Sequence, residues 1–259
     1  MKNKEKIDYF KILNKSFKIK YGFFSRNGGL SINDFSSLNC SLSSGDKKII
    51  VNKNINLAKK KIKLENTNLK FINQIHGSKI SEINKNNFKI KTFADGAITY
   101  DKDISLAILT ADCAPIFFFD NEKTFICAIH SGWKGCFKNI VNKALKKILK
   151  KNKNVEISCI IGPCLEQNNF EVSKAFYNKF KKKDLNYKLF FQPKINSKKF
   201  LFDMRGLINF QLEEFSLKNI YNIKKDTYKN PNLFFSHRRS NQDSTLPTGR
   251  MINIIGFAK

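Results

Sequence analysis

The segment from residue 104 to residue 150, ISLAILTADCAPIFFFDNEKTFICAIHSGWKGCFKNIVNKALKKILK, predicts three strands followed by a helix. Apolar runs at 104–109, 116–119 and 124–129 have the length of buried strands and are separated by polar residues. A glycine-bounded turn follows, and apolar residues then recur at helical spacing between lysines, which predicts an amphipathic helix over 135–150. Further helices are expected over 173–182 and 205–215. We therefore expect an α+β fold of mixed sheets packed together with helices outside.

Three side chains with useful chemistry lie near the ends of predicted strands. Cys113 follows the first apolar run, His130 follows the third, and His76 follows the segment 71–75. Two imidazoles and a thiolate suit borderline-soft ions such as zinc, and three protein ligands leave a coordination position open for water or substrate. The trio is therefore a candidate catalytic metal site. Its ligands match no short zinc-finger spacing, so the alternative is polar residues that only satisfy hydrogen bonds.

Arginine is rare in this chain but concentrated in a few segments. Lysine and arginine together number 48, of which only five are arginines. Four of them lie in short motifs rich in polar residues and glycine: Arg26, Arg238, Arg239 and Arg250. The rigid guanidinium fork suits bidentate contact with phosphate or carboxylate, which lysine cannot reproduce. The alternative is a structural ion pair, for example with Asp95 or Asp112.

Composition indicates the broad class of protein. The 259 residues contain no linker rich in proline, glycine or serine, so we expect one domain over residues 1–259. The six cysteines form no disulfide pattern, and most are expected to be buried apolar residues. Residues 1–6 lack the apolar core of a signal peptide, and no window has the roughly 18 apolar residues of a membrane span. These features predict a cytoplasmic protein with no membrane partner.

The formal net charge of +27 raises the question of a nucleic-acid partner. The lysines are spread through the chain, and groups such as those at 59–61 and 146–151 belong to predicted helices whose opposite faces are apolar. They are explained as solvated helix faces. We therefore expect no specific nucleic-acid partner.

Seven motif groups follow one another from about residue 20 to the C-terminus. They are FFSRNGGLS at 23–31, NQIHG at 73–77, ADGAIT at 94–99, TADCAP at 110–115, IHSGWKG at 129–135, IGPC at 161–164 with FEV at 170–172, and SHRR at 236–239 with TGR at 248–250. As an ordered set they resemble the YfiH/DUF152 family. This family is also called the purine nucleoside phosphorylase or multicopper polyphenol oxidase (laccase) family, and its bacterial members include a peptidoglycan editing factor.

The resemblance implies a fold, a metal site and an activity. The fold is a four-layer α/β/β/α arrangement, and the metal is zinc on the residues matching His76, Cys113 and His130. The implied reaction is phosphorolysis of adenosine, inosine, guanosine and S-methyl-5′-thioadenosine, with adenosine deamination as a second activity. In such a reaction Arg26 and Arg250 are candidates to bind phosphate. His237, in the polar turn expected at 236–239 after the apolar pair 234–235, is a candidate to transfer a proton. Purine nucleosides and phosphate are the expected partners, while no oligomeric state is predicted.

Three other functions compete with this interpretation. A multicopper oxidase needs many more histidines than the three present, although one cysteine and two histidines can hold a single copper in a polyphenol oxidoreductase. A cysteine-type amide hydrolase would use Cys113 as nucleophile and His130 as base without metal, and would fit peptidoglycan precursor editing. A noncatalytic binding module is the third. Metal analysis and phosphate dependence distinguish these alternatives.

Overall fold

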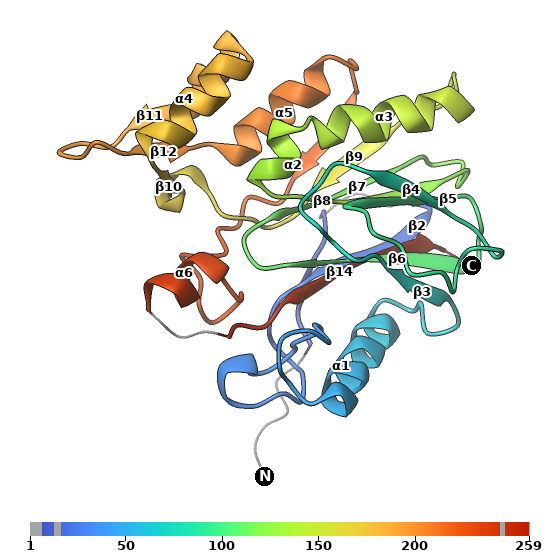
Figure 1. Ribbon diagram of the computed structural model, residues 1–259. Coiled ribbons are helices and arrows are strands. Elements are labelled where there is room, and N and C mark those ends of the chain that lie inside the picture. Colours follow the sequence, from blue (N-terminus) through green and yellow to red (C-terminus); the bar gives the residue numbers. More distant parts are fainter. Residues whose placement is uncertain (1–6, 13–16, 244–246, 259) are drawn as a thin grey trace.

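The computed structural model describes residues 7–12, 17–243 and 247–258, in which the strands form two large sheets and one small sheet (Figure 1). The five-stranded sheet has the order β1 (Tyr9–Phe10), β2 (Ile19–Phe24), β14 (Met251–Phe257), β6 (Ile104–Thr110) and β3 (Asn68–Phe71). The six-stranded sheet has the order β13 (Asn219–Asn222), β9 (Ser158–Ile161), β7 (Ala114–Phe119), β8 (Ile126–Ser131), β5 (Gly96–Thr99) and β4 (Ile80–Ile83). Both sheets combine parallel and antiparallel pairs.

Three apolar clusters lie between successive layers of helices and sheets. Helix α1 (Lys48–Lys61) packs on the outer face of the five-stranded sheet, and a second cluster fills the space between the two large sheets. The other face of the six-stranded sheet is covered by α2 (Trp133–Phe137), α3 (Ile140–Lys151) and α5 (Met204–Glu213). Figure 1 shows α1 below the sheets and these three helices above them. The predicted α+β fold and its four-layer α/β/β/α arrangement are thus confirmed.

A peripheral unit extends from this framework. The small sheet has the order β10 (Glu171–Val172), β12 (Phe200–Phe202) and β11 (Phe191–Pro193), and α4 (Lys174–Lys183) packs against it. Aromatic side chains join the helix to the sheet, with the rings of Phe176 and Phe202 5.5 Å apart. The short helix α6 (His237–Gln242) lies on the same side of the molecule (Figure 1).

The strands β6, β7 and β8 explain how the candidate site is assembled. The chain leaves β6 in one large sheet and enters β7 in the other, so Cys113 lies in the turn that crosses between the sheets. In the antiparallel pair of β7 and β8, Pro115 lies opposite His130. This register brings His130 to the same end of the sheet as the turn. The apolar run at 124–129 predicted that His130 follows the strand. In the structure His130 is instead part of β8.

Two further predictions need correction. The helix expected over 135–150 is two helices, because Asn139 adopts a left-handed backbone conformation (φ 53°) between α2 and α3. The Asn139 side chain holds this break by accepting hydrogen bonds from Tyr187 Oη (3.0 Å) and Gln211 Nε2 (3.2 Å). The polar turn expected at 236–239 is instead the start of α6. The other two expected helices correspond to α4 and α5, which begin after the capping side chains of Ser173 and Asp203.

None of the helices in the described ranges combines the length and the apolar character that crossing a membrane requires. Residues 1–6, on which the expectation about a signal peptide depends, lie outside the described residues.

Candidate metal centre

The fold brings His76, Cys113 and His130 together. Their ligand atoms all lie within 4.8 Å of one another, and no other such group of histidine, cysteine or acidic residues occurs in the described part of the chain. The rings of His76 and His130 are 4.9 Å apart and nearly perpendicular, at 81°. Atoms this close can share one ion with bonds of about 2.0–2.3 Å after small side-chain rotations. The donor set of two nitrogens and one sulfur fits zinc or a single copper.

Asp95 determines the position of His76. His76 has a positive φ of 55°, and the backbone N–H groups of residues 75–77 all point at the Asp95 carboxylate. His76 N donates to Oδ1 at 2.9 Å, and Gly77 N donates to Oδ2 at 2.5 Å. A cluster of backbone donors around one carboxylate makes a rigid turn. The exposed His76 imidazole therefore projects from a fixed backbone.

The same aspartate orients His130. The Asp95 carboxylate contacts His130 Nδ1 at 2.9 Å, while its backbone carbonyl accepts from His130 N at 2.7 Å. Because Nδ1 is occupied, Nε2 of His130 is the nitrogen available to a metal. Burial by itself raises the pKa of Asp95, but hydrogen bonds from His130 and Gly77 outweigh it and lower the pKa below the ordinary value. Asp95 is thus held ionised next to the ligand.

Cys113 is favoured as a thiolate. Burial opposes its ionisation, but the charge of His130 and hydrogen bonds from His130 and His76 lower the pKa of Cys113 to about 6. For His130, burial again acts in the opposite direction, and Cys113 and Asp95 raise its pKa to about 9. A Cβ at Gly132 would lie 2.7 Å from Cys113 Sγ, so the glycine of the HSGWKG turn makes room for the sulfur. The thiolate is the form that binds metals and attacks carbonyls.

The three side chains open into a cavity of about 810 Å³, a size typical of small-molecule sites. Two other residues singled out from the sequence, His237 and Arg250, line the same cavity. Its remaining lining comes from the segments around Cys40 and Gln74, from β6, and from Lys48 and Ile55 of α1. The cavity therefore combines a candidate metal site with basic side chains.

Arg250 and His237 each have nitrogen atoms without a hydrogen-bond partner among the described residues. Arg250 Nη1 donates to the carbonyls of Thr248 and Gly249, each at 2.9 Å, whereas its Nε and Nη2 have no hydrogen-bond partner among the described residues. His237 Nε2 contacts Asn241 Nδ2 at 3.1 Å. Burial and the nearby charge of Arg250 lower the pKa of His237, so its imidazole is neutral at neutral pH.

The structure does not bring Arg26 to this cavity. Arg26 Nε donates to the Ser36 carbonyl at 2.6 Å, and Nη1 donates to the Pro231 carbonyl at 3.2 Å. Its guanidinium lies 4.4 Å from the centre of the Phe235 ring, and it lines a separate cavity of about 290 Å³. A rigid fork also suits backbone carbonyls, which sequence reasoning did not consider.

The guanidinium groups of Arg238 and Arg239 likewise donate to backbone carbonyls and not to the carboxylates of Asp95 or Asp112. Arg238 Nη1 donates to the Glu171 carbonyl at 2.9 Å, and the Arg239 guanidinium donates to the carbonyls of residues 227, 228 and 234. These contacts tie α6 to the surrounding loops.

Four other cysteines and the single tryptophan, Trp133, pack within the protein. Cys127, Cys136, Cys159 and Cys164 are fully buried, as expected, and burial raises the pKa of each. Trp133 packs against Phe176 with ring centroids 5.1 Å apart and does not line the cavity. Sequence analysis missed the roles of Asp95 and Asp112. The only sequence signal for them was their place in the ADGAIT and TADCAP motifs.

Comparisons with known proteins identify relatives along nearly the whole chain. Among curated proteins, a purine nucleoside phosphorylase of Rickettsia conorii is 36% identical over 169 residues, which is 65% of this chain and 70% of that protein. A purine nucleoside phosphorylase of Haemophilus influenzae is 29% identical over 234 residues, which is 90% of this chain and 92% of that protein.

Solved structures share the fold. A Neisseria meningitidis protein assigned to DUF152 matches with a TM-score of 0.84 at 24% identity, covering 98% of this chain and 99% of that one. YfiH of Bacillus licheniformis matches with a TM-score of 0.82 at 25% identity, covering 92% of each chain. Residues 20–258 match the model of the family described as multi-copper polyphenol oxidoreductase laccase. The chain therefore belongs to this family, as its resemblance to YfiH and DUF152 proteins predicts.

Proposed function

We propose that this protein is a zinc-dependent purine nucleoside phosphorylase, and that residues 1–259 form one catalytic domain. One observation carries the proposal: a single cavity combines the three-ligand group with Arg250 and His237. Relatives aligned over most of the chain bear the name purine nucleoside phosphorylase, which supports this reaction over others. The substrates we propose are adenosine, inosine, guanosine and S-methyl-5′-thioadenosine, with adenosine deamination as a second activity.

The reaction joins a phosphate oxygen to C1′ of the ribose and breaks the bond from C1′ to N9. The bonding electron pair leaves with the purine, which then takes up a proton. The free Nε and Nη2 of Arg250 suit two phosphate oxygens. His237, in its protonated form, is the proposed proton donor to the departing purine, and the share of this form grows as the pH falls toward its lowered pKa. When bound, zinc on His76, Cys113 and His130 would supply a Lewis acid for an oxyanion or a water.

The family description mentions several coppers, but this chain has only three histidines. That number is too small for a blue site together with a trinuclear cluster. A single copper on the same three residues is the form in which oxidase chemistry fits the chain. Metal analysis of protein purified without added metal distinguishes zinc from copper.

A cysteine-type amide hydrolase is the second candidate, and the pairing of Cys113 with His130 favours it. It uses the same residues without an ion and would fit peptidoglycan precursor editing. The two functions differ in their response to metal removal. A chelator should abolish phosphorolysis, whereas a thiol hydrolase should keep its activity.

The deciding experiment incubates the metal-analysed protein with inosine or adenosine, with and without phosphate, and identifies the products. The proposal expects free base and ribose 1-phosphate only when phosphate is present. Inosine and ammonia from adenosine without phosphate would reveal the deaminase activity alone. Absence of base release with every nucleoside tested would refute the phosphorylase assignment.

A further inference from the structure

Asp112 occupies an unusual backbone position beside the candidate metal centre. It precedes Cys113 in the turn between β6 and β7, where the chain passes from one large sheet to the other. Its φ of 87° lies in a region that residues with a side chain rarely adopt, and the residue is only 8% exposed. Such a conformation persists where the surrounding contacts hold it.

The Asp112 carboxylate receives three hydrogen bonds from two distant segments. Thr227 Oγ1 donates to Oδ1 at 2.7 Å, and Ser236 Oγ and Arg238 N donate to Oδ2 at 3.0 and 2.7 Å. The backbone carbonyl of Asp112 accepts from Leu165 N at 2.9 Å. None of these donors is a cationic side chain. The carboxylate therefore acts by joining parts of the chain and not by forming an ion pair.

One of the joined parts is the first turn of α6. The first backbone N–H groups of a helix have no partner within the helix. Ser236 caps α6 by accepting from Arg239 N at 3.1 Å, and Asp112 satisfies the preceding N–H, that of Arg238. His237 lies between the two residues that Asp112 holds, and Cys113 is covalently next to Asp112. One carboxylate thus connects two cavity-lining residues that are far apart in the sequence.

We propose that Asp112 is a positioning residue that fixes the Cys113 ligand and the His237 imidazole relative to each other across the cavity. Asp112 is not among the residues that line the cavity, so it acts through its two neighbours. The consequence for turnover rests on the proposed phosphorylase function, in which both neighbours act on one substrate. The consequence for metal binding depends only on the ligand Cys113.

Two substitutions separate hydrogen bonding from charge. Asp112→Ala removes both acceptor oxygens. Asp112→Asn keeps one oxygen for Ser236 and Arg238, while its new N–H₂ group can donate to the Thr227 hydroxyl, which can reverse its role. The positioning role therefore predicts a severe effect for alanine and a mild one for asparagine.

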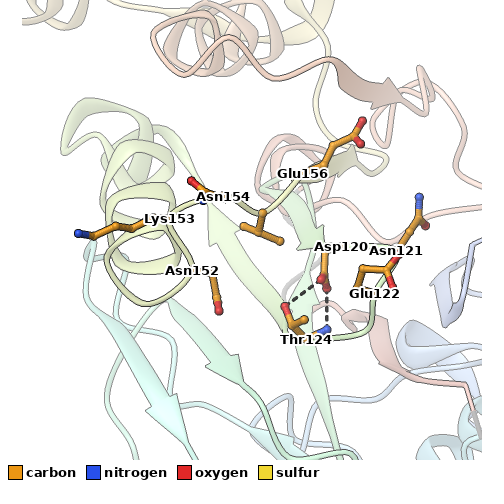
Figure 2. Close-up of a pocket in the computed structure, with 9 residues that line it drawn as sticks. Asp120, Asn121, Glu122, Thr124, Asn152, Lys153, Asn154 and Glu156 are labelled. Atoms are coloured by element: carbon orange, nitrogen blue, oxygen red, sulfur yellow. Dashed lines mark hydrogen bonds between the residues drawn. The ribbon is translucent and has the colours of Figure 1, made fainter.

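Asp120 provides a matched control at the opposite end of β7. It is 1% exposed and also receives three hydrogen bonds, from Thr124 N and Thr124 Oγ1 at 2.8 Å and from Phe125 N at 3.3 Å. Figure 2 shows this aspartate with Thr124 in a cavity that none of the three candidate metal ligands lines. Its donors are four and five residues away in sequence, so it holds only a local turn. Asp120→Ala should lower thermal stability and leave the metal centre unchanged.

The test measures zinc affinity by competition with a chelating dye, turnover of inosine with phosphate, and the unfolding temperature. For Asp112→Ala we expect zinc affinity to fall about 10-fold or more and turnover to fall about 10²-fold, while Asp112→Asn stays close to wild type. Wild-type zinc affinity in Asp112→Ala, equal losses in Asp112→Asn, or equal losses in Asp120→Ala would each overturn the proposal.

A milder variant covers the case in which Asp112→Ala does not fold. Ser236→Ala removes one of the three donors together with the cap of α6, so it should lower turnover while zinc affinity is retained. Wild-type turnover in that variant would then overturn the proposal.

If the wild-type protein releases no base with phosphate, the proposed function fails, and zinc affinity in Asp112→Asn, Asp120→Ala and Thr227→Val still tests Asp112. In that case only the loss of the Thr227 hydrogen bond should weaken zinc binding, and unchanged affinity in that variant would contradict the positioning role.

Discussion

Asp112 and Glu171 are acidic residues in two of the family motifs, and both contact Arg238, but they do so through different groups. The buried carboxylate of Asp112 accepts from Arg238 N, whereas Glu171 uses its backbone carbonyl to accept from Arg238 Nη1 at 2.9 Å. The Glu171 carboxylate instead pairs with Lys194 and Lys199, each at 2.5 Å, on the outer small sheet. Presence in a motif therefore does not identify which group of a residue matters. Substitutions should have large effects at the cavity and small ones at the outer sheet.

The largest effect is expected for Cys113→Ala at the cavity. The wild-type protein should hold about one zinc per chain, and the variant should lose the metal because two imidazoles remain of three ligands. The loss of zinc affinity should exceed the roughly 10–100-fold change that follows loss of an outer hydrogen-bond partner. Metal analysis, a nucleoside assay and circular dichroism measure occupancy, activity and fold. Full zinc occupancy in a folded variant would show that Cys113 is not a ligand.

A smaller effect is expected for His237→Gln, which keeps hydrogen-bonding capacity but cannot transfer a proton. Zinc content should stay normal, while turnover should fall about 10²-fold, the usual scale for a lost acid or base. Burial and Arg250 hold the pKa of His237 below its ordinary value of 6.5, so the protonated donor becomes more abundant and the wild-type rate should rise as the pH falls below 6.5. The variant should lack this dependence. Near-normal turnover with an unchanged pH profile would assign His237 a structural role.

Arg250→Lys tests the phosphate end of the cavity. The substitution keeps the positive charge but removes the fork, so the KM for phosphate should rise about 10-fold, in line with the loss of a hydrogen bond to a charged group. Arg26→Lys is the matched control, because Arg26 lines a different cavity. If both substitutions change the phosphate dependence equally, or if neither changes it, Arg250 does not bind phosphate.

The sequence predicted the parts of the fold that depend on local periodicity. The apolar runs at 104–109 and 116–119 correspond to β6 and β7 within two residues. The interruption of the helix at Asn139 was missed because its cause is tertiary: the side chain accepts hydrogen bonds from Tyr187 and Gln211, which are 48 and 72 residues away. Local propensity does not contain such contacts.

The same distinction applies to the site. His76, Cys113 and His130 could be selected from ligand chemistry alone, and the structure brings them together. Asp95 and Asp112 stand out in the sequence only as members of the ADGAIT and TADCAP motifs. Their roles could not be predicted, because their partners are distant: His130 is 35 residues from Asp95, and Thr227 is 115 residues from Asp112. Arg26 was selected for its fork, but its carbonyl partners, Ser36 and Pro231, are visible only in the folded chain.

The smallest effect is expected for Glu171→Gln at the outer sheet. Hydrogen bonds from Lys194 and Lys199 lower the pKa of Glu171 from 4.5 to about 2. A carboxyl with a lowered pKa in the folded state adds stability above the unfolded value, and this stability is lost as the pH falls from about 4.5 toward 2. Both lysines are about half exposed, so solvent screening should limit the contribution to about 1 kcal/mol or less. Urea unfolding at pH 6 and pH 3 should show a wild-type advantage at the higher pH that shrinks at the lower one. Turnover should not change, because the Glu171 backbone carbonyl still accepts from Arg238 Nη1. A clear loss of turnover would mean that the Glu171 carboxylate, and not only its backbone, contributes to catalysis in the cavity.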